Sequence, residues 1–501
     1  MSRILVEHSG GTKTLESQYG ESLLDLLRRG GFSVSAPCGG NGTCGKCRVR
    51  LGDGRKVLAC RTPAEDCRVI LEENSGGAIC TDSGAAAKSV EAREGIGAAV
   101  DIGTTTVAVK LFDLKDGREL GVKSAWNAQA PYGADVITRC QFIMEHEDGL
   151  ERLSGLIRDQ VFRMADELRR EEKIDEFFLA GNTVMEHIFM GLSPVSIATA
   201  PFKPLSLFDG GEVYAEKGAA LSCSPCVAGY VGGDITAGLL ASGLDEKEEC
   251  SLFLDVGTNG EMALGGMNGF LCCAVASGPA FEGAGISCGM ASADGAVSRV
   301  RWEEDGPVFQ VIGGGEAKGI CGSGLLDLLA MLLELELVDE TGRLLPPDEA
   351  PEGFERWLSE DENGNGVFHL TDRVSLSAAD VRQLQLAKAA VAAGIAVLTE
   401  TAGISADQID RLYLAGGFGA YLNVESAAAI GMLPDCLKER TVSLGNSALT
   451  GAAMALLSGE KRKQLLKIKE KCQYLELSGN ERFNRLYPEH MMFGGEDELW
   501  N

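Results

Sequence analysis

The spacing of apolar residues divides the chain into a short N-terminal unit, a polar stretch and a long region of strands and helices. Residues 21–31 place four leucines on one helical side before a glycine stop, which predicts a helix. The segments typical of strands are 4–9, 12–17, 47–52, 55–60 and 67–72. Together they predict a small α+β unit over residues 1–73.

The rest of the chain begins with a stretch of small and polar residues, 74–96, which predicts a flexible linker. From residue 97 the pattern changes to strands separated by helices, and the helices are expected at 150–170, 319–337 and 378–401. The tail, 481–501, shows no clear period and is expected to be irregular.

One pattern occurs twice within residues 97–480. The segments AAVDIGTTTVAVKLFD (98–113) and LFLDVGTNGEMALGG (252–266) share a strand that ends in Asp-x-Gly-Thr, a polar turn and a second strand. A single repeat of this size predicts a duplicated fold with two facing lobes, about 97–250 and 251–480, and not a solenoid of short repeats.

Composition excludes several classes of protein. With 501 residues, 45% hydrophobic and 24% charged, the chain has the balance of a folded soluble protein of several domains. The net charge of −27 would repel a nucleic-acid backbone. We find no apolar run of the roughly 20 residues that span a membrane, and no signal peptide. We therefore expect a cytoplasmic protein without a nucleic-acid or membrane partner.

Four cysteines, Cys38, Cys44, Cys47 and Cys60, lie in or beside a glycine-rich turn. In a reducing compartment such a cluster indicates a metal centre and not disulfides. The glycines allow the sharp bends that three ligands within ten residues require, and their N–H groups can donate to sulfur. A 2Fe-2S cluster is the favoured interpretation; a zinc site and buried free thiols are the alternatives. Cys67 competes with Cys60 as fourth ligand.

The two Asp-x-Gly-Thr turns carry the second candidate chemistry. Each presents a carboxylate beside a turn whose N–H and hydroxyl groups point outward. Two such turns facing each other could hold a polyphosphate, with Asp101 and Asp255 directed at its hydrated Mg2+.

Both regions resemble known families. The cysteine loop is similar to adrenodoxin and plant-type ferredoxins, which implies a β-grasp fold. Residues 97–459 resemble the actin, sugar-kinase and heat-shock-chaperone ATPases, which implies an actin-like, ribonuclease H-like α/β domain that binds ATP. The segments that carry the second resemblance, besides the two turns, are GGDITAGLLASGL (232–244), LYLAGGFGAYLN (412–423) and GNSALTGAAMALLSG (445–459).

The ATPase resemblance implies roles for individual residues. Asp101 and Asp255 would position Mg2+ through water, and Asp234 would orient the attacking water. Asp234 could instead be a helix N-cap. Phosphate would contact Gly103, Thr104, Thr105, Thr106, Gly257, Thr258, Asn259 and Gly260, and adenosine would contact Gly416, Gly417 and Phe418.

The order of the two domains resembles the reductive activators of corrinoid proteins. The resemblance implies ATP-dependent reduction of a Co(II) corrinoid to Co(I) by an electron from the 2Fe-2S cluster. It also implies a corrinoid iron-sulfur protein or a corrinoid-binding methyltransferase subunit as partner, an upstream electron donor and a homodimer. The chain is expected to lack the sizeable middle domain of longer members. The alternatives are an activator of another low-potential enzyme and a non-catalytic nucleotide or redox sensor.

Several other residues have weaker candidate chemistry. Cys223 and Cys226 have the spacing of a redox dithiol without its usual strand-helix context. Cys272 and Cys273 are expected in a buried strand, and His187 is expected to pack in a helix. The glycine-rich segments 276–286 and 319–329 are expected either to touch phosphate or to be tight turns.

Overall fold

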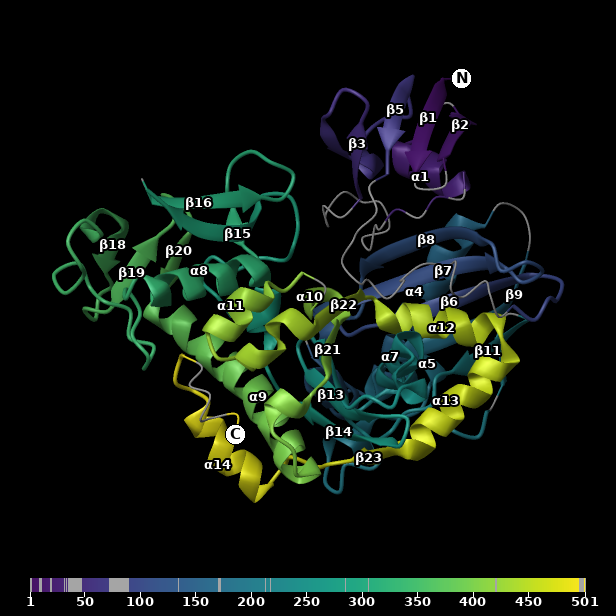
Figure 1. Ribbon diagram of the computed structural model, residues 1–501. Helices are drawn as coiled ribbons and strands as arrows, with labels where there is room; N and C mark the ends of the chain where they lie inside the picture. The colour runs from purple at the N-terminus through teal and green to yellow at the C-terminus, as the bar shows by residue number, and fades with distance from the viewer. Residues whose placement is uncertain are drawn as a thin grey trace.

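The N-terminal domain is a five-stranded sheet with one helix against it (Figure 1). Its elements are β1 (Arg3–His8), β2 (Gly11–Glu16), α1 (Leu23–Arg29), β3 (Arg48–Leu51), β4 (Lys56–Leu58), a 3-10 turn (Ala59–Arg61) and β5 (Cys67–Ile70). The strand order is β2-β1-β5-β3-β4, with β1 parallel to β5. The four leucines of α1 are all buried against the sheet. This arrangement confirms the expected α+β fold.

The computed structural model of the protein describes most of the chain. The described residues are 2–8, 11–18, 20–30, 32, 34, 47–71, 90–133, 135–169, 173–211, 213–216, 218–283, 285–304, 306–419, 421–494 and 500. Most of the expected linker therefore lies outside them. Its last residues are bound to the following domain, because Glu91 N donates to Leu457 O and Arg93 N donates to Leu114 O.

The first lobe of the large domain is built on a six-stranded sheet of order β10-β11-β9-β6-β7-β8. Its elements are β6 (Ile96–Ile102), β7 (Thr106–Asp113), β8 (Glu119–Trp126), α3 (Val136–Glu145), α4 (Gly149–Leu168), β9 (Ile174–Gly181), α5 (Thr183–Met190), α6 (Val195–Ala198), β10 (Tyr214–Glu216), β11 (Ala219–Cys223) and α7 (Gly233–Ser242). Helices α3, α4 and α5 pack on one face of this sheet.

The second lobe has a six-stranded sheet of order β22-β21-β12-β13-β14-β23. Its elements are β12 (Ser251–Val256), β13 (Gly260–Gly266), β14 (Gly269–Val275), β15 (Ala296–Glu303), β16 (Gly306–Val311), β17 (Gly319–Ile320), α8 (Gly322–Glu334), β18 (Leu358–Glu360), β19 (Gly366–His369), β20 (Ser375–Ser377), α9 (Ala378–Ala402), β21 (Arg411–Ala415), α10 (Gly416–Gly419), α11 (Val424–Ala429), β22 (Thr441–Gly445), α12 (Ser447–Leu457), α13 (Gly459–Lys471), β23 (Cys472–Tyr474) and α14 (Glu481–Glu489).

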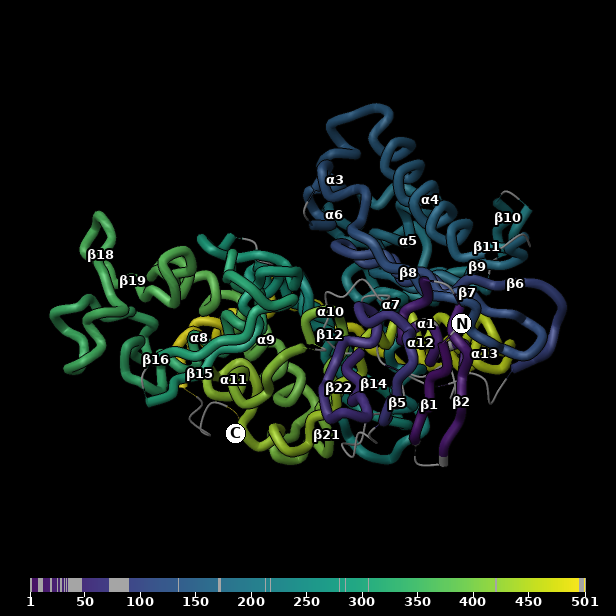
Figure 2. Tube along the Cα trace, turned by 90° about the horizontal axis from the view of Figure 1, so that it is seen from above, coloured from purple at the N-terminus to yellow at the C-terminus, as the bar shows by residue number. Residues whose placement is uncertain are grey.

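The two sheets repeat the same local topology, which confirms the expected duplication. The hairpin β6–β7 has β9 parallel to β6, and the hairpin β12–β13 has β21 parallel to β12. Helices α7 and α12 lie between the sheets, as Figures 1 and 2 show. Apolar residues of both sheets meet these helices in one core that includes Ala99 and Phe253. The central strands β6, β9, β12, β13 and β21 are buried on both faces, which explains their nearly continuous apolar sequence.

Two expectations about helices need correction. Residues 319–337 begin with the short strand β17, so α8 starts only at Gly322. The tail is not wholly irregular, because 481–489 form α14, which packs on α9. The long apolar helix α9 has the length and composition of a membrane span, but 83% of its most apolar window is buried in the protein. It is the central helix of the second lobe's core.

The contact between α7 and α12 sets the distance between the lobes. A Cβ atom on Gly451 of α12 would lie 2.0 Å from Ala237 O of α7, and a Cβ on Gly238 would lie 2.4 Å from the Phe253 ring. Only glycine at these positions allows so close an approach, which explains the small residues of both helices.

We predict that Gly451→Ala lowers the stability of the large domain by about 1–3 kcal/mol, because the helices must separate. The matched control is Gly155→Ala in α4, where a Cβ would meet no atom within 4 Å. That change should leave stability unchanged or raise it by about 0.5–1 kcal/mol. Differential scanning calorimetry measures both; equal effects of the two substitutions would contradict the prediction.

Candidate functional site

Cys47 and Cys60 of the N-terminal domain lie side by side. Cys47 directly precedes β3 and is fully buried, and Cys60 lies in the 3-10 turn after β4. Their sulfurs are 3.1 Å apart, and Cys60 N donates to Cys47 Sγ over 3.5 Å. This separation exceeds the S–S bond of a disulfide, so the two cysteines are free thiols that lie close enough together to bind one metal centre after a small adjustment. Cys38 and Cys44 lie outside the described residues.

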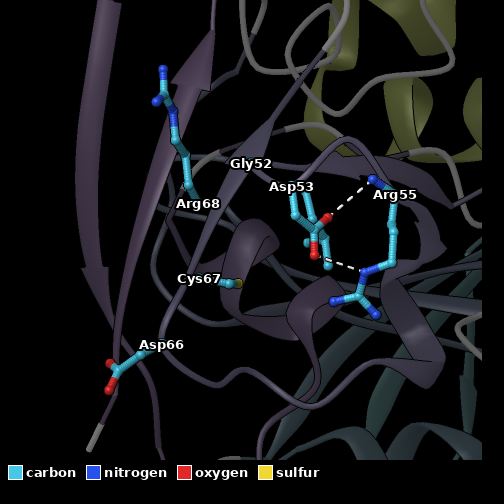
Figure 3. Close-up of a pocket in the computed structure, with 7 residues that line it drawn as sticks. Gly52, Asp53, Arg55, Asp66, Cys67 and Arg68 are labelled. Carbon is cyan, nitrogen blue, oxygen red and sulfur yellow. Dashed lines mark hydrogen bonds and ion pairs between the residues drawn. The ribbon is translucent and has the colours of Figure 1, made fainter.

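Cys67, the alternative fourth ligand, has different surroundings. It lies at the start of β5 in a small surface pocket with Asp53, Arg55, Asp66 and Arg68 (Figure 3). Burial raises the pKa of the Cys67 thiol, and the charges of Asp66 and Asp53 raise it further. Because a ligand must be a thiolate, these surroundings favour Cys60 over Cys67.

The first Asp-x-Gly-Thr turn joins β6 to β7, and the backbone carbonyl of each residue in the turn accepts a hydrogen bond from a residue outside it. Asn127 Nδ2 donates to Gly103 O over 2.9 Å, and Asn127 N donates to Thr105 O over 2.9 Å. Arg139 Nη2 donates to Thr104 O over 2.6 Å. With its carbonyls engaged, the turn can present its N–H groups to an anion.

The second turn, between β12 and β13, is held in a similar way by neutral groups. Ser277 Oγ donates to Gly257 O over 3.1 Å and to Thr258 O over 3.2 Å. Gly278 N also donates to Thr258 O. In both predicted phosphate loops, hydrogen bonds from residues outside the loop to its carbonyl oxygens therefore fix the backbone.

Both turns meet at Glu282, which the sequence did not single out within the segment 276–286. Thr105 Oγ1 donates to Glu282 Oε2 over 3.0 Å. Burial raises the pKa of Glu282, while the hydrogen bond from Thr105 and the nearby polar groups of Thr258 lower it. The side chain therefore bridges the first lobe to the second between the two predicted phosphate loops.

The three predicted catalytic aspartates, Asp101, Asp234 and Asp255, lie close enough together for their charges to affect one another. Burial raises the pKa of Asp101 to about 6, although Asn446 Nδ2 donates to its Oδ2 over 2.7 Å. Burial, and then the charge of Asp101, raises the pKa of Asp255 to about 7. The pKa of Asp234 lies well above its usual value because of burial and the charges of Asp255 and Asp101. A cation among these carboxylates would relieve their repulsion.

Asp234 lies one residue inside helix α7 and not at its N-cap. The N-cap of α7 is Gly232, and Asp234 lies in the first turn, where Ile235 N donates to its Oδ1. The N-cap interpretation is therefore wrong. Among the described residues no three acidic, thiol or imidazole side chains are placed to bind one metal ion directly.

Two further buried carboxylates, those of Glu261 and Glu186, lie near the aspartates, and the sequence did not indicate them as site residues. Glu261 directly follows Gly260, is 7% exposed, and within the described structure its Oε1 has no hydrogen-bond partner. Burial and the charges of Asp234 and Asp255 raise the pKa of Glu261. Glu186 of α5 is fully buried, and burial raises its pKa strongly. The position of Glu261 beside a predicted loop was a usable indication; Glu186 had none.

The predicted adenosine segment lies beside Asp255. Gly416 has φ +84°, and a Cβ there would lie 2.2 Å from Asp255 Oδ1, so only glycine fits. Gly417 is exposed, with open space around its Cα. Phe418 stacks on Phe281 with ring centroids 5.0 Å apart. The segment thus connects the second lobe's surface to the carboxylates.

The surroundings of the remaining cysteine and histidine candidates indicate roles in packing and hydrogen bonding, not in chemistry. Cys226 is buried, its Sγ donates to Glu186 Oε2 over 3.2 Å, and burial raises its pKa. A thiol held in this form is a poor redox nucleophile. Cys272 and Cys273 are buried in β14. His187 packs in α5, where Nδ1 contacts Thr183 O and Ser206 N donates to Nε2.

Comparison with protein families gives three matches along the chain. Residues 6–66 match the 2Fe-2S iron-sulfur cluster binding domain, residues 96–247 match the RACo middle region, and residues 249–500 match the C-terminal domain of RACo, the ASKHA domain. The expectation of a missing middle domain is therefore wrong. The middle region is present, and it coincides with the first lobe.

The chain is also similar to individual proteins over most of its length. It is 33% identical to the corrinoid activation enzyme RamQ of Eubacterium limosum, over 79% of this chain and 70% of that protein. It is 24% identical to the [Co(II) methylated amine-specific corrinoid protein] reductase of Methanosarcina barkeri, over 78% and 76%. A solved structure, "Reductive activator for corrinoid,iron-sulfur protein", superposes with TM-score 0.72 at 30% identity and covers 98% of both chains.

We predict that Cys60→Ser abolishes or strongly alters the visible absorption of the 2Fe-2S cluster, because it removes a sulfur next to Cys47. Cys67→Ser is the matched control and should preserve the spectrum. Absorption and EPR spectra of the anaerobically purified full-length variants test this. Loss of the cluster in Cys67→Ser with retention in Cys60→Ser would reverse the assignment.

We predict that the nucleotide-free, metal-free protein becomes less stable as the pH rises from about 4 to 7. The folded-state pKa values of Asp101 and Asp255 exceed those of the unfolded chain, so over this range the folded protein holds protons that the unfolded chain has lost. Asp255→Asn should reduce this loss and raise stability at pH 8 by about 1–3 kcal/mol. Thermal unfolding across pH measures it; an unchanged pH slope in the variant would contradict it.

Proposed function

This chain belongs to the family of reductive activators of corrinoid proteins, and we propose that it uses ATP to drive one electron from its 2Fe-2S cluster to a Co(II) corrinoid. The family matches assign a 2Fe-2S domain to the N-terminus and an ATP-binding ASKHA domain to the C-terminal half. The chain is accordingly an ATP-dependent enzyme that activates corrinoid proteins by reduction.

The cluster would be held by Cys38, Cys44, Cys47 and Cys60. A 2Fe-2S cluster of the plant type supplies one electron at about −400 mV. The close Cys47 and Cys60 sulfurs fit this assignment, and the N–H of Cys60 directed at Cys47 Sγ would stabilise a reduced, more negative centre.

The nucleotide would lie between the lobes. In this proposal the N–H groups of the two turns bind the phosphates, Asp101 and Asp255 hold Mg2+ through water, and Asp234 orients the attacking water. Gly416, Gly417 and Phe418 frame the adenosine. The raised pKa values of the aspartates support this view, because carboxylates without a cationic partner are suited to a divalent cation.

One observation carries the link between the two activities. Arg61, which directly follows Cys60, forms an ion pair with Asp294 of the second lobe, in which Nη2 of Arg61 donates to both carboxylate oxygens over 2.8 and 2.7 Å. The electron-carrying domain is therefore docked on the ATPase domain through the residue beside a proposed cluster ligand. Each 59 mV of uphill one-electron transfer costs about 1.4 kcal/mol, so movement of the lobes around ATP could supply a few hundred millivolts.

The partner is a corrinoid protein, and the finer assignments are proposals. We propose a corrinoid iron-sulfur protein or a corrinoid-binding methyltransferase subunit as the electron acceptor, a separate reductase as upstream donor, a homodimer as the assembly and the cytoplasm as the location. The relatives include both a reductive activator for a corrinoid iron-sulfur protein and a reductase for a methylated-amine-specific corrinoid protein.

We predict that the reduced, cluster-loaded protein removes the EPR signal of a Co(II) corrinoid protein only when MgATP is present. Asp255→Asn should keep the cluster spectrum and lower the ATP-dependent rate at least tenfold, because it weakens the hold on Mg2+. The control is Asp245→Asn, a partly buried carboxylate bound to Gln464 outside the site, which should leave the rate unchanged. Reduction at full rate without ATP, or ATP binding without any turnover, would contradict the proposal; the second result would favour a sensor.

A further inference from the structure

Arg139 of α3 contacts the first phosphate loop at one of its carbonyl oxygens. Its side chain is fully buried, and Nη2 donates to Thr104 O over 2.6 Å. Its other donors go to Gly133 O, to Gln129 Oε1 over 3.1 Å and to Met185 Sδ. The guanidinium is thus fixed on several sides and touches the loop at its centre.

The partners of Arg139 are all neutral. The guanidinium makes no ion pair with any carboxylate in the part of the chain that the structure describes. The carboxylate of Asp135, at the start of α3, acts on it only over a longer distance. Burial lowers the pKa of Arg139 to about 10, which still leaves it charged at neutral pH. A buried charge without an opposite partner costs several kcal/mol.

The second phosphate loop indicates that this charge is not needed to shape the backbone. There, Ser277 Oγ and Gly278 N hold the carbonyls without any charge. At the first loop, Asn127 already holds Gly103 O and Thr105 O. A neutral donor could hold Thr104 O equally well at a lower cost of burial. The free-energy cost of burying the Arg139 charge would be offset if an anion bound to the loop balanced this charge.

Residues of opposite charge lie near the turn. Asp101 lies on β6, two residues before Gly103, and belongs to the carboxylate group, while Arg139 donates to Thr104 O. Asn182, which caps α5, donates to Thr104 Oγ1 over 2.9 Å and so fixes the side chain as well. A bound Mg2+ and polyphosphate would place positive charge near the aspartates and negative charge near Arg139.

We propose that Arg139 is a positioning residue for the nucleotide, which presets the first phosphate loop and whose charge attracts the polyphosphate through it. This inference rests on the proposed ATP site and deepens it. It assigns the recognition of the anionic part of the ligand, as distinct from its adenosine part, to a residue that does not touch the ligand.

The test compares the binding of ATP with the binding of adenosine by isothermal titration of the full-length protein. For Arg139→Met we expect ATP binding to weaken at least tenfold while adenosine binding changes less than twofold. Arg139→Lys keeps the charge and should recover most of the preference for ATP. The matched control is Arg158→Met, another arginine of this lobe, which faces Phe189 O and Glu216 and should leave both affinities unchanged.

The outcomes separate this inference from the proposed function. If the unaltered protein binds no ATP, the proposed function fails. If it binds ATP and Arg139→Met binds ATP equally well, or loses ATP and adenosine affinity to the same extent, only the role of Arg139 fails. If Arg139→Met does not fold, Arg139→Lys decides, because a purely structural role of the guanidinium fork would lower the affinity for both ligands alike.

Discussion

The close contact of α7 with α12 is the constraint on which the site depends. Gly451 lies against the carbonyl of Ala237, so the helices, and with them the two sheets, approach as closely as backbones allow. The N-terminal ends of both helices then reach the same place. Asp234 enters from the first turn of α7, and Asn446, the N-cap of α12, donates to Asp101. Wider helix spacing would separate these groups, because each is attached to a helix end.

This packing concentrates charge that the protein alone does not neutralise. The carboxylates of Asp101, Asp234, Asp255 and Glu261 raise one another's pKa values, and Arg139, which donates to Thr104 O of the first loop, contacts no carboxylate among the described residues. Stability alone would favour neutral residues at such positions. In the proposed function a cation and a polyanion bind between these groups, and such binding would make the arrangement favourable and so link ligand binding to the stability of the protein.

The sequence predicted those parts of the fold and site that local patterns encode. The repeated Asp-x-Gly-Thr hairpins, the small residues of α12 and the Gly416-Gly417 pair at the start of α10 were recognisable because each requires a specific backbone geometry. Glu282, Asn127 and Arg139 were not, because each acts on a loop distant in sequence and only the tertiary fold brings them together. The irregular tail was misjudged because α14 is short and gains its stability from α9.

The connection between the domains follows from one segment of the second lobe. Residue Glu282 at its start contacts Thr105 of the first lobe, and Asp294 at its end pairs with Arg61 beside Cys60. Both side chains of that ion pair are substantially exposed, and exposed pairs contribute only about 0–1 kcal/mol. Such a contact can orient the N-terminal domain on the second lobe without fixing it there. Because an electron carrier must also reach another protein, weak docking next to Cys60, the proposed cluster ligand, serves it better than a buried interface.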